Sequence, residues 1–316
     1  MTTPGFLAIE IGGTKLQLFA GTGDGNIVDR RRFFVDRPRG AEGIREQIAQ
    51  AVPELIEKWQ PAAIGIGYGG PVDWRTGRIW RSYHIAGWSD FPMGDWLGER
   101  TGLPVFVEND SNLAALGEAM CGAGKGLNPV FYTNMGSGVG GGLVVDGRLY
   151  HGAPPGEMEI GHVRMYGPDR ILEDDCAGWS LDRQIRAAVE KAPESKLAQL
   201  VAADPGGEAR HLAAALEAGD PLAQSLLATL AGHFANALGV VVQLLHPEGI
   251  VIGGGVSLIG EPLRAAVAER LPQFIMDVYR PGPQIRLAGL REESVPVGAL
   301  LMAADRSTTL KTTPSL

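Results

Sequence analysis

The chain has 316 residues, of which 45% are hydrophobic and 20% charged, and its formal net charge is −8. This length predicts a globular protein with room for two domains, and the negative charge argues against a surface that neutralises nucleic-acid phosphates, so we expect small-molecule partners. Two cysteines, Cys121 and Cys176, are too few for a disulfide framework or a zinc site. The N-terminus lacks a basic stretch followed by an apolar one, and no run approaches the ~18 apolar residues of a membrane span, so we expect a cytoplasmic protein.

The first predicted elements surround a glycine turn. Gly12 and Gly13 separate two apolar runs between residues 6 and 19, which predicts a strand, a turn and a second strand. The elements predicted next are a helix over 43–59, a strand over 63–67, an aromatic loop over 83–91, a strand over 105–107 and a helix from Ser111. Either Asp110 or Asn109 would be the N-cap of that helix.

The second half opens with a similar pattern. Residues 130–150 again predict strand, glycine-rich turn and strand, and the pair Asp146-Gly147 predicts a hairpin turn. Asp220 and Pro221 predict the start of a long amphipathic helix. A strand over 250–252, a helix from Glu261, a last helix near 297–304 and a frayed tail over 307–316 complete the pattern. The two similar openings predict two related α/β halves, with ligands at the carboxyl ends of strands.

Three glycine clusters adjoin strands, and the first two could bring backbone N–H groups close to a phosphate. Their residues are Gly12, Gly13, Thr14 and Lys15, then Gly136, Ser137 and Gly138, then Gly254 and Gly255. The Walker motif does not fit, because no Lys-Ser or Lys-Thr pair follows the glycines, and the dinucleotide fingerprint does not fit, because the chain continues as a strand. Two glycine hairpins from different halves would instead grip a polyphosphate across a cleft.

Five short segments resemble the ROK family of bacterial sugar kinases and sugar-responsive repressors, within the actin-like and hexokinase-like ATPases. They are IEIGGTK at 9–15, ENDSN at 108–112, MGSGVGGG at 135–142, EIGH at 159–162 and IVIGGGV at 250–256. The resemblance runs from Leu7 to about Ala304. It implies a two-domain α/β fold, the actin-like and hexokinase-like (ribonuclease H-like) ATPase fold with a central cleft. The small domain would be 1–118, completed by a C-terminal helix over 298–316, and the large domain 119–297.

Asp110 is the predicted catalytic base. The resemblance places it in the family's NDxN segment, and chemistry supports the same role, because a sugar hydroxyl has a pKa far above 7 and needs a carboxylate to accept its proton as the P–O bond forms. The alternative is that Asp110 only caps a helix, which is worth ~1 kcal/mol. The two roles do not exclude each other.

The resemblance also implies a set of sugar ligands. They are Asn109, Glu159, His162, Glu173, Gly70 and His84. Amide, carboxylate and imidazole groups together supply the donors and acceptors that neighbouring hydroxyls need, and Glu159 could fix the ring tautomer of His162. Glu173 could also be an exposed glutamate at a helix start. His84 stands where the family usually has asparagine, which leaves the choice of sugar open.

The chain departs from the family at two further points. Most members carry a cysteine-rich zinc motif after the EIGH histidine, whereas residues 163–172 are shorter and contain no cysteine, so no structural zinc is expected. Packing, or contacts among Arg164, Asp169 and Arg170, must then hold this loop. Glu10 stands where aspartate is usual and retains a carboxylate near the Mg²⁺ ion that ATP carries.

These features predict an ATP-dependent kinase that phosphorylates a hexose hydroxyl, with ATP and Mg²⁺ as cofactors. Glucose is the family's commonest substrate, and fructose, mannose, allose, N-acetylmannosamine or a modified hexose stay open. Family habit predicts a homodimer, and the charge and the lack of a long apolar run predict no nucleic-acid or membrane partner. A repressor would need a winged helix-turn-helix ahead of the first glycine loop, where only five residues precede Phe6. A catalytically silent sugar-binding protein and a polyphosphate-dependent kinase are the remaining rivals.

Overall fold

A computed structural model describes residues 5–82 and 85–312. The chain divides into two compact units by its contacts. The first unit is Met1–Lys125, Gly142–Met158 and Glu292–Leu316, and the second is Gly126–Gly141 and Glu159–Arg291. This division places residues 119–125, 142–158 and 292–297 in the first unit, whereas the predicted boundaries assign them to the large domain.

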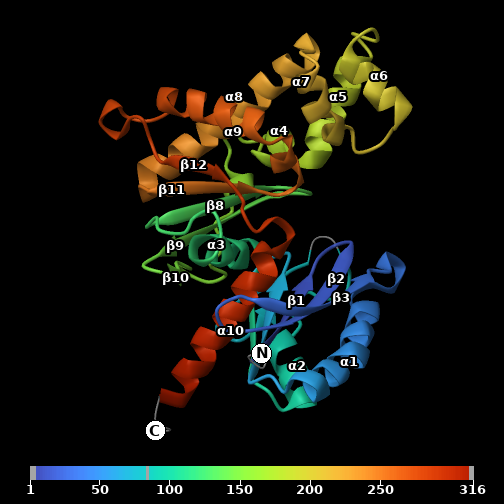
Figure 1. The fold of residues 1–316 in the computed structure, drawn as a ribbon, viewed down its shortest axis with the longest axis vertical. Coiled ribbons are helices and arrows are strands. Elements are labelled where there is room, and N and C mark those ends of the chain that lie inside the picture. The colour runs from blue at the N-terminus through green and yellow to red at the C-terminus, as the bar shows by residue number, and fades with distance from the viewer. Residues whose placement is uncertain (1–4, 83–84, 313–316) are drawn as a thin grey trace. The chain divides into compact units, whose positions relative to one another are not determined.

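The first unit is built on a five-stranded sheet with the order β3-β2-β1-β4-β7 (Figure 1). Its strands are β1 (Phe6–Ile11), β2 (Lys15–Gly21), β3 (Ile27–Phe34), β4 (Ala63–Tyr68) and β7 (Val105–Asn109). β1, β2 and β3 pair antiparallel, as the predicted glycine hairpin requires, whereas β1, β4 and β7 run parallel. Because parallel strands end at the same edge of a sheet, three carboxyl ends lie side by side.

Four helices belong to this unit in the described part of the chain. They are α1 (Gly40–Trp59), α2 (Met93–Thr101), α3 (Asp110–Met120) and α10 (Ser294–Thr312), and two short strands, β5 (Val72–Asp73) and β6 (Arg78–Ile79), form a separate pair. α10 packs against α3 at small residues. A Cβ atom on Gly298 would collide with the carbonyl oxygen of Leu113, and one on Gly117 with that of Ser294. Glycine therefore lets the two helices meet backbone to backbone, which fixes α10 on α3.

The last helix is longer than the helix near 297–304 that the residue pattern predicts, and it covers most of the helix over 298–316 that the resemblance implies. It runs from Ser294 to Thr312, so the expected fraying is wrong for residues 307–312, while residues 313–316 lie outside the described part. The hydroxyl groups of Ser307 and Thr308 both donate to the carbonyl oxygen of Ala304, one turn back. These polar side chains are thus satisfied within the helix that they were expected to end.

The second five-stranded sheet has the order β10-β9-β8-β11-β12 and repeats the pattern of the first (Figure 1). Its strands are β8 (Val130–Met135), β9 (Val139–Val145), β10 (Arg148–Leu149), β11 (Gly249–Gly253) and β12 (Gln284–Leu287). β9 and β10 pair antiparallel, and β8, β11 and β12 run parallel. The turn between β9 and β10 has positive φ at Asp146 (51°) and Gly147 (72°), as its hairpin type requires, so the predicted turn is confirmed.

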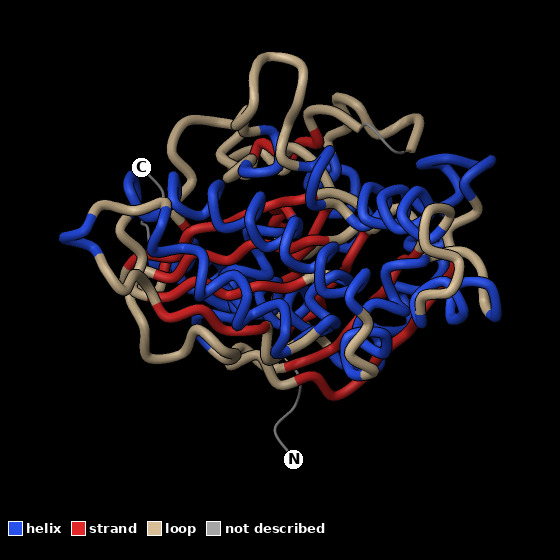
Figure 2. The backbone as a smooth tube through the Cα atoms, turned by 90° about the horizontal axis from the view of Figure 1, so that it is seen from above, coloured by secondary structure: helices blue, strands red, loops and turns tan. Residues whose placement is uncertain are grey.

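The second unit contains its own α-helices, and Figure 2 draws these, like all helices of the chain, as blue tubes and all strands in red. They are α4 (Glu173–Cys176), α5 (Gly178–Val189), α6 (Lys196–Ala203), α7 (Leu212–Glu217), α8 (Pro221–Leu245) and α9 (Glu261–Arg270). The predicted cap of α8 is confirmed, because Oδ1 of Asp220 accepts a 2.7 Å hydrogen bond from the backbone of Leu222. Within the described residues, α8 alone is long and apolar enough to cross a membrane, but more than half of its apolar stretch is buried in the fold.

Candidate active site

Three parallel strands of the first unit end in one row. In the register of β1, β4 and β7, the residues opposite one another are Ile11, Tyr68 and Asn109. The residues that follow them, Gly12, Gly69 and Asp110, are neighbours along the same edge. Adjacent strands lie ~4.8 Å apart, so the first glycine loop and the backbone of Asp110 are separated by two strand spacings, on the order of 10 Å. The sheet thus brings the first glycine loop and the predicted base together.

Asn109 caps the helix that begins with Asp110. Its Oδ1 atom accepts hydrogen bonds from the backbone N–H groups of Ser111 (2.8 Å) and Asn112 (3.1 Å), and its Nδ2 atom donates to the carbonyl oxygen of Gly70 (3.2 Å). The alternative in which Asp110 is the cap is therefore wrong. Asn109 is buried and joins α3 to the Gly69-Gly70 turn, whereas its role as a sugar ligand stays a prediction.

Asp110 is half-buried in the first turn of α3. Its Oδ1 atom accepts a hydrogen bond of 3.3 Å from the hydroxyl of Ser111, and its Oδ2 atom lies 3.2 Å from the place that a Cβ atom would take on Gly69. Burial raises the pKa of Tyr68, and the negative charge of Asp110 adds to this increase. The absence of a side chain at position 69 therefore leaves room for a carboxylate at the strand edge.

The first glycine loop is held by backbone contacts. Gly12 N–H donates to the carbonyl oxygen of Lys15 (3.0 Å), and the carbonyl oxygen of Thr14 accepts from Val35 N–H (3.2 Å). Arg37 adds a contact that the sequence reasoning missed, since its Nε atom donates to the carbonyl oxygen of Gly13 (3.2 Å). The signal was present as a run of arginines over 30–39, which could have indicated positive charge beside this loop.

Glu10 lies on β1, two residues before the loop. Its carboxylate accepts a hydrogen bond from Nε2 of Gln17 (2.9 Å) and lies 3.7 Å from Nζ of Lys15. Burial raises the pKa of Glu10, and Lys15 and Gln17 oppose this increase. Lys15 is predicted to donate a hydrogen bond to a phosphate. In the structure it is paired with Glu10, the carboxylate that is predicted to lie near the metal ion.

The second glycine loop is anchored at both ends. Gly136 N–H donates to the carbonyl oxygen of Gly138 (2.8 Å), and Gly136 in turn accepts from Gly178 N–H (2.7 Å) at the start of α5. Oδ1 of Asn134 accepts from Gly140 N–H (2.6 Å), which closes the hairpin, while Ser137 is exposed at its tip. The loop therefore has a fixed backbone and an accessible apex.

The third glycine cluster lies beside the second. β8 and β11 pair in parallel with Asn134 opposite Gly253, so both strands end at one edge of the sheet. Gly254 has φ +81°, and a Cβ atom there would collide with the carbonyl oxygen of Met135. Glycine is therefore required at position 254, both for its conformation and for this close approach. Gly255, which begins a 3₁₀ turn, has open space around its Cα atom.

The predicted sugar ligands of the second unit also converge. Glu159 precedes the 3₁₀ turn Ile160–His162, and Oε1 of Glu173 accepts a 2.8 Å hydrogen bond from Val139 N–H. Desolvation by surrounding protein atoms raises the pKa of Glu159, although its side chain is exposed at the surface; the charge of His162 opposes this increase and that of Glu173 adds to it.

Glu173 is more than an exposed glutamate at a helix start. It does begin α4, but it is half-buried, and a Cβ atom on Gly138 would lie 2.7 Å from its Oε1 atom. Gly161 makes room on the other side, where an added Cβ atom would lie 2.9 Å from Glu173 Cγ. Glu173 therefore connects the second glycine loop with the turn that carries His162.

Hydrogen bonds hold the loop over residues 163–172, which the sequence predicts to lack zinc. Tyr166 packs edge-on against His233 of α8, and its hydroxyl lies 3.0 Å from Nδ1 of that ring and accepts a 3.2 Å bond from Nδ2 of Asn236. The described residues contain no group of three or more His, Cys, Asp or Glu side chains placed to hold a metal ion.

Two of the three residues predicted to hold this loop contribute to it. Arg164 Nε donates to the carbonyl oxygen of Pro168 (2.8 Å), and Arg170 pairs with the buried carboxylate of Asp175. Asp169 is exposed and forms no hydrogen bond or ion pair within the described part of the chain. His84, the last predicted sugar ligand, lies outside the described residues.

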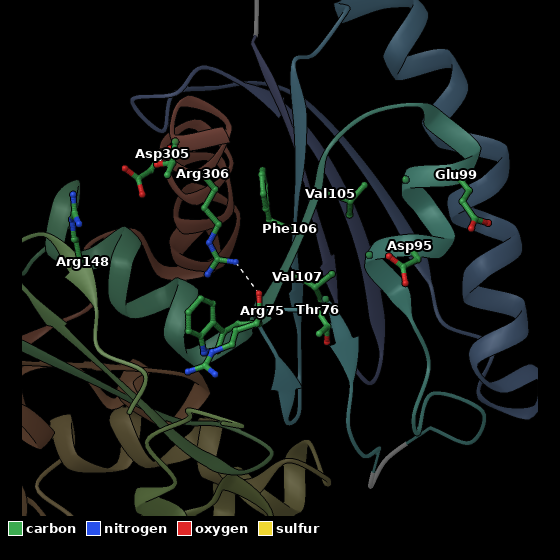
Figure 3. Close-up of a pocket in the computed structure, with 15 residues that line it drawn as sticks. Arg75, Thr76, Asp95, Glu99, Val105, Phe106, Val107, Arg148, Asp305 and Arg306 are labelled. Carbon is green, nitrogen blue, oxygen red and sulfur yellow. Dashed lines mark hydrogen bonds between the residues drawn. The ribbon is translucent and has the colours of Figure 1, made fainter. Parts of the chain in front are cut away.

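A cavity of about 880 Å³ lies in the first unit (Figure 3). It is lined by Val105, Phe106 and Val107 of β7, by residues of α2, by the turn 74–77 and by Asp305 and Arg306 of α10, with Arg148 nearby. None of the predicted site residues lines it.

Comparisons with known proteins give the same family as the motifs. A family model described as ROK family matches residues 6–306. A glucokinase of Halalkalibacterium halodurans is 32% identical over 309 residues, which covers 93% of each chain. A ROK family glucokinase from Streptomyces griseus, solved in complex with glucose and AMPPNP, has a TM-score of 0.82 and 30% identity, covering 95% of this chain and 99% of that one. A ROK hexokinase from Thermus thermophilus has a TM-score of 0.79 at 30% identity, covering 96% and 99%.

These matches confirm the predicted fold class, the actin-like and hexokinase-like ATPase fold, as well as the resemblance read from the five motifs. They extend over nearly the whole chain, and the two sheets repeat one strand order as that fold implies. The chain belongs to the ROK family.

Proposed function

We propose that this protein is an ATP-dependent hexose kinase, with glucose as the first acceptor to test. The observation that carries the proposal is the common edge of β1, β4 and β7, where a glycine loop suited to phosphate lies two strands from the carboxylate of Asp110. Family membership and the similarity to glucokinases support the same activity.

In this proposal Asp110 accepts the proton of the attacking sugar hydroxyl as the terminal phosphate is transferred. Its position at the start of α3 suits the role, since Asn109 caps the helix and Gly69 leaves space beside the carboxylate. The second and third glycine loops would hold the nucleotide, and Glu159, His162 and Glu173 would bind sugar hydroxyls, with His84 as a further contact that influences sugar choice. Proton transfer to a positioned base contributes about 10²–10⁴-fold to such reactions.

Magnesium would accompany ATP. Glu10 fits a single-carboxylate contribution to such a site, because Mg²⁺ takes oxygen ligands and usually binds one or two carboxylates together with phosphates, and the side chain of Glu10 is 13% exposed beside the first loop. The ion would neutralise charge on the transferred phosphate. Glu10 would hold it directly or through water, at the cost of weakening the contact with Lys15.

An ADP-release assay over a panel of hexoses and N-acetylhexosamines tests the proposal. Glucose should give sugar-dependent ADP release in the presence of ATP and Mg²⁺, and product analysis should show one phosphate ester per ADP. A catalytically silent sugar-binding protein would bind sugar in titration but release no ADP, and a polyphosphate-dependent kinase would form the ester without ATP. Absence of ester from every sugar with either donor would reject the proposal.

We also propose a cytoplasmic homodimer without nucleic-acid or membrane partners. The proposal is supported by family habit and by the net charge of −8, which opposes binding to polyanions. Light scattering coupled to size-exclusion chromatography should give twice the chain mass, and a mass of one chain at micromolar concentration would reject the dimer.

A further inference from the structure

A fully buried carboxylate lies two positions before the predicted base. Glu108, at the end of β7, is 0% exposed. Burying a charged carboxylate is costly unless hydrogen bonds and opposite charges compensate it, so the surroundings of Glu108 must supply them. Asp110 lies two residues further along the chain. The groups that neutralise and bind Glu108 therefore also influence the surroundings of Asp110.

One oxygen of Glu108 is bound to the start of α3. Its Oε1 atom accepts hydrogen bonds from Asn109 N–H and from Nδ2 of Asn112, each 3.1 Å long. These two donors flank Asp110 on both sides in the chain. Nδ2 of Asn112 also donates to the carbonyl oxygen of Gly156 (3.3 Å), so the first turn of α3 is held from two directions.

The other oxygen of Glu108 is bound to residues far away in the sequence. Its Oε2 atom lies 2.7 Å from Nε2 of His151 and 3.2 Å from Nη2 of Arg306, on α10. The His151 ring stacks on Trp74 with ring centroids 4.3 Å apart, and Nη1 of Arg306 donates to the carbonyl oxygen of Trp74 (3.1 Å). A carboxylate only accepts hydrogen bonds, so contact with the ionised form of Glu108 requires the proton on Nε2 of His151.

The position of Arg306 depends on the packing of α10. In Figure 3 the side chain of Arg306 reaches from α10 toward β7, next to Phe106. Loss of water around it lowers the pKa of Arg306, and Glu108 is the largest opposing influence. A lysine could not replace it fully, because the guanidinium bridges Glu108 and the Trp74 carbonyl through two different nitrogen atoms.

We propose that Glu108, clamped by His151 and Arg306, is a positioning residue that fixes the first turn of α3 and thereby aims Asp110 at the sugar hydroxyl. The proposal deepens the proposed kinase function and rests on it. The C-terminal helix then contributes to catalysis without touching substrate, through Arg306. Catalytic geometry is sensitive at this scale, since a displacement of ~1 Å can reduce a rate by about 10²-fold.

Four variants test the clamp. Arg306→Gln and His151→Ala each remove a partner of Glu108, His151→Gln keeps an N–H near the position of the ring Nε2, and Arg75→Gln is the matched control. Arg75 is an exposed arginine of the same cavity that lies 5.3 Å from the Trp74 ring and does not bond to Glu108. For each variant, kcat, both KM values and the melting temperature are measured, together with hydrogen exchange of the peptide that spans residues 105–115.

Arg306→Gln and His151→Ala should lower kcat by about tenfold or more while both KM values stay within about threefold, because only alignment of the base is lost. His151→Gln should recover most of kcat, and Arg75→Gln should match wild type. Hydrogen exchange over 105–115 should accelerate in the first two variants alone, and this readout does not depend on any activity. If wild type phosphorylates no sugar, the proposed function fails, and the exchange data still judge the clamp. The proposal for the clamp would be overturned if Arg306→Gln and His151→Ala both kept wild-type kcat and unchanged hydrogen exchange. If one of the two variants does not fold, the other variant decides.

Discussion

The Oδ2 atom of Asp110 lies 3.2 Å from the position that a Cβ atom would occupy on Gly69. This distance is shorter than ordinary van der Waals contact, so any side chain at position 69 would displace the carboxylate by a few tenths of an ångström. Gly69 is also the residue that follows β4 in the row of three strand ends. Gly69 and the predicted base Asp110 are therefore direct neighbours, although 41 positions separate them in the sequence.

Gly69→Ala should lower kcat with little change in stability. No left-handed φ is required at this position, so alanine causes no backbone strain, and the loss comes from misplacement of Asp110, which we expect to reduce kcat by about tenfold. Gly232→Ala in α8 is the matched control, because a Cβ atom there meets nothing within 4 Å. Equal kcat for both variants would show that the carboxylate tolerates the added methyl group.

Several strands and helix starts of both units could be predicted from the sequence because their signals are local. Glycine pairs next to apolar runs correctly predicted β1, β2, β8 and β9, and the Asp220-Pro221 pair correctly predicted the start of α8. The end of α10 could not be predicted in this way. Its Ser and Thr residues disfavour a helix by propensity, but their hydroxyls bond to helix carbonyls, and the helix packs on α3 through glycines distant in sequence.

The candidate site shows the same division. Short motifs indicated Asp110, the glycine loops and Glu159 to His162, since the chain carries each of these within a few residues. The clamp on Glu108 was missed, because His151 lies 43 positions from it and Arg306 198 positions from it. The packing of α10 brings Arg306 to Glu108, and the segment after β10 brings His151 there; neither contact is encoded in a local pattern.

Glu173 should respond differently to two substitutions. Glu173→Gln keeps an oxygen that can accept from Val139 N–H, so the second glycine loop should stay in place and KM for ATP should be within about twofold of wild type. Glu173→Ala leaves that N–H without its partner and should raise KM for ATP by about tenfold, the scale of one lost hydrogen bond. A sugar KM that rises in both variants would assign the charge of Glu173 to sugar binding; unchanged KM for ATP in the alanine variant would refute its role in the loop.

Tyr166→Phe tests how the loop over 163–172 is held. The variant keeps the ring packing on His233 but removes the hydroxyl that bonds to His233 and Asn236. The melting temperature should fall by about 2–4 °C, as expected for a loss of ~1 kcal/mol. Sugar KM should rise more than KM for ATP, because His162 lies at the start of this loop. Tyr150→Phe, at an exposed position, is the control.

The wild-type protein should contain no stoichiometric zinc, because the loop over 163–172 lacks the cysteine ligands of a zinc site. Elemental analysis of a tag-free sample should find fewer than about one zinc ion per ten chains. Zinc chelators should leave the melting temperature of wild type unchanged. One zinc ion per chain would refute this expectation and would show that other residues than those around Tyr166 bind the metal.

Glu10→Gln should change the pH dependence of stability. Burial raises the pKa of Glu10 in the folded protein, so ionisation of this side chain costs more free energy in the folded than in the unfolded state. The wild-type protein is therefore most stabilised by protonated Glu10 below the unfolded-state pKa of about 4.3, and it loses this stabilisation as the pH rises through the folded-state pKa. Glutamine cannot ionise and avoids this loss. The melting temperature of the variant relative to wild type should therefore increase from pH 4.5 to pH 7, whereas Glu217→Gln, at an exposed position on α7, should show no such trend. A constant difference across this range would contradict the prediction.

Asp110→Asn is the most direct test of the proposed base. Asparagine keeps the size of the side chain and removes its basicity, and Asn109 still caps α3 through Ser111 and Asn112, so the start of the helix should stay folded. We expect kcat to fall by roughly 10²–10⁴-fold, the usual contribution of a general base, with sugar affinity and melting temperature close to wild type.

The structure makes this outcome easy to interpret, because the helix cap and the predicted base are different residues. Asn109→Ala is the matched variant: it removes the cap and the bond to Gly70 but leaves the carboxylate of Asp110, so it should lower stability by about 1 kcal/mol and reduce kcat less than Asp110→Asn does. If Asp110→Asn retains more than about a tenth of wild-type kcat, the assignment of the base is wrong, since a general base contributes at least about 10²-fold. A melting temperature that falls in Asp110→Asn as far as in Asn109→Ala would instead assign Asp110 a structural role at the start of α3.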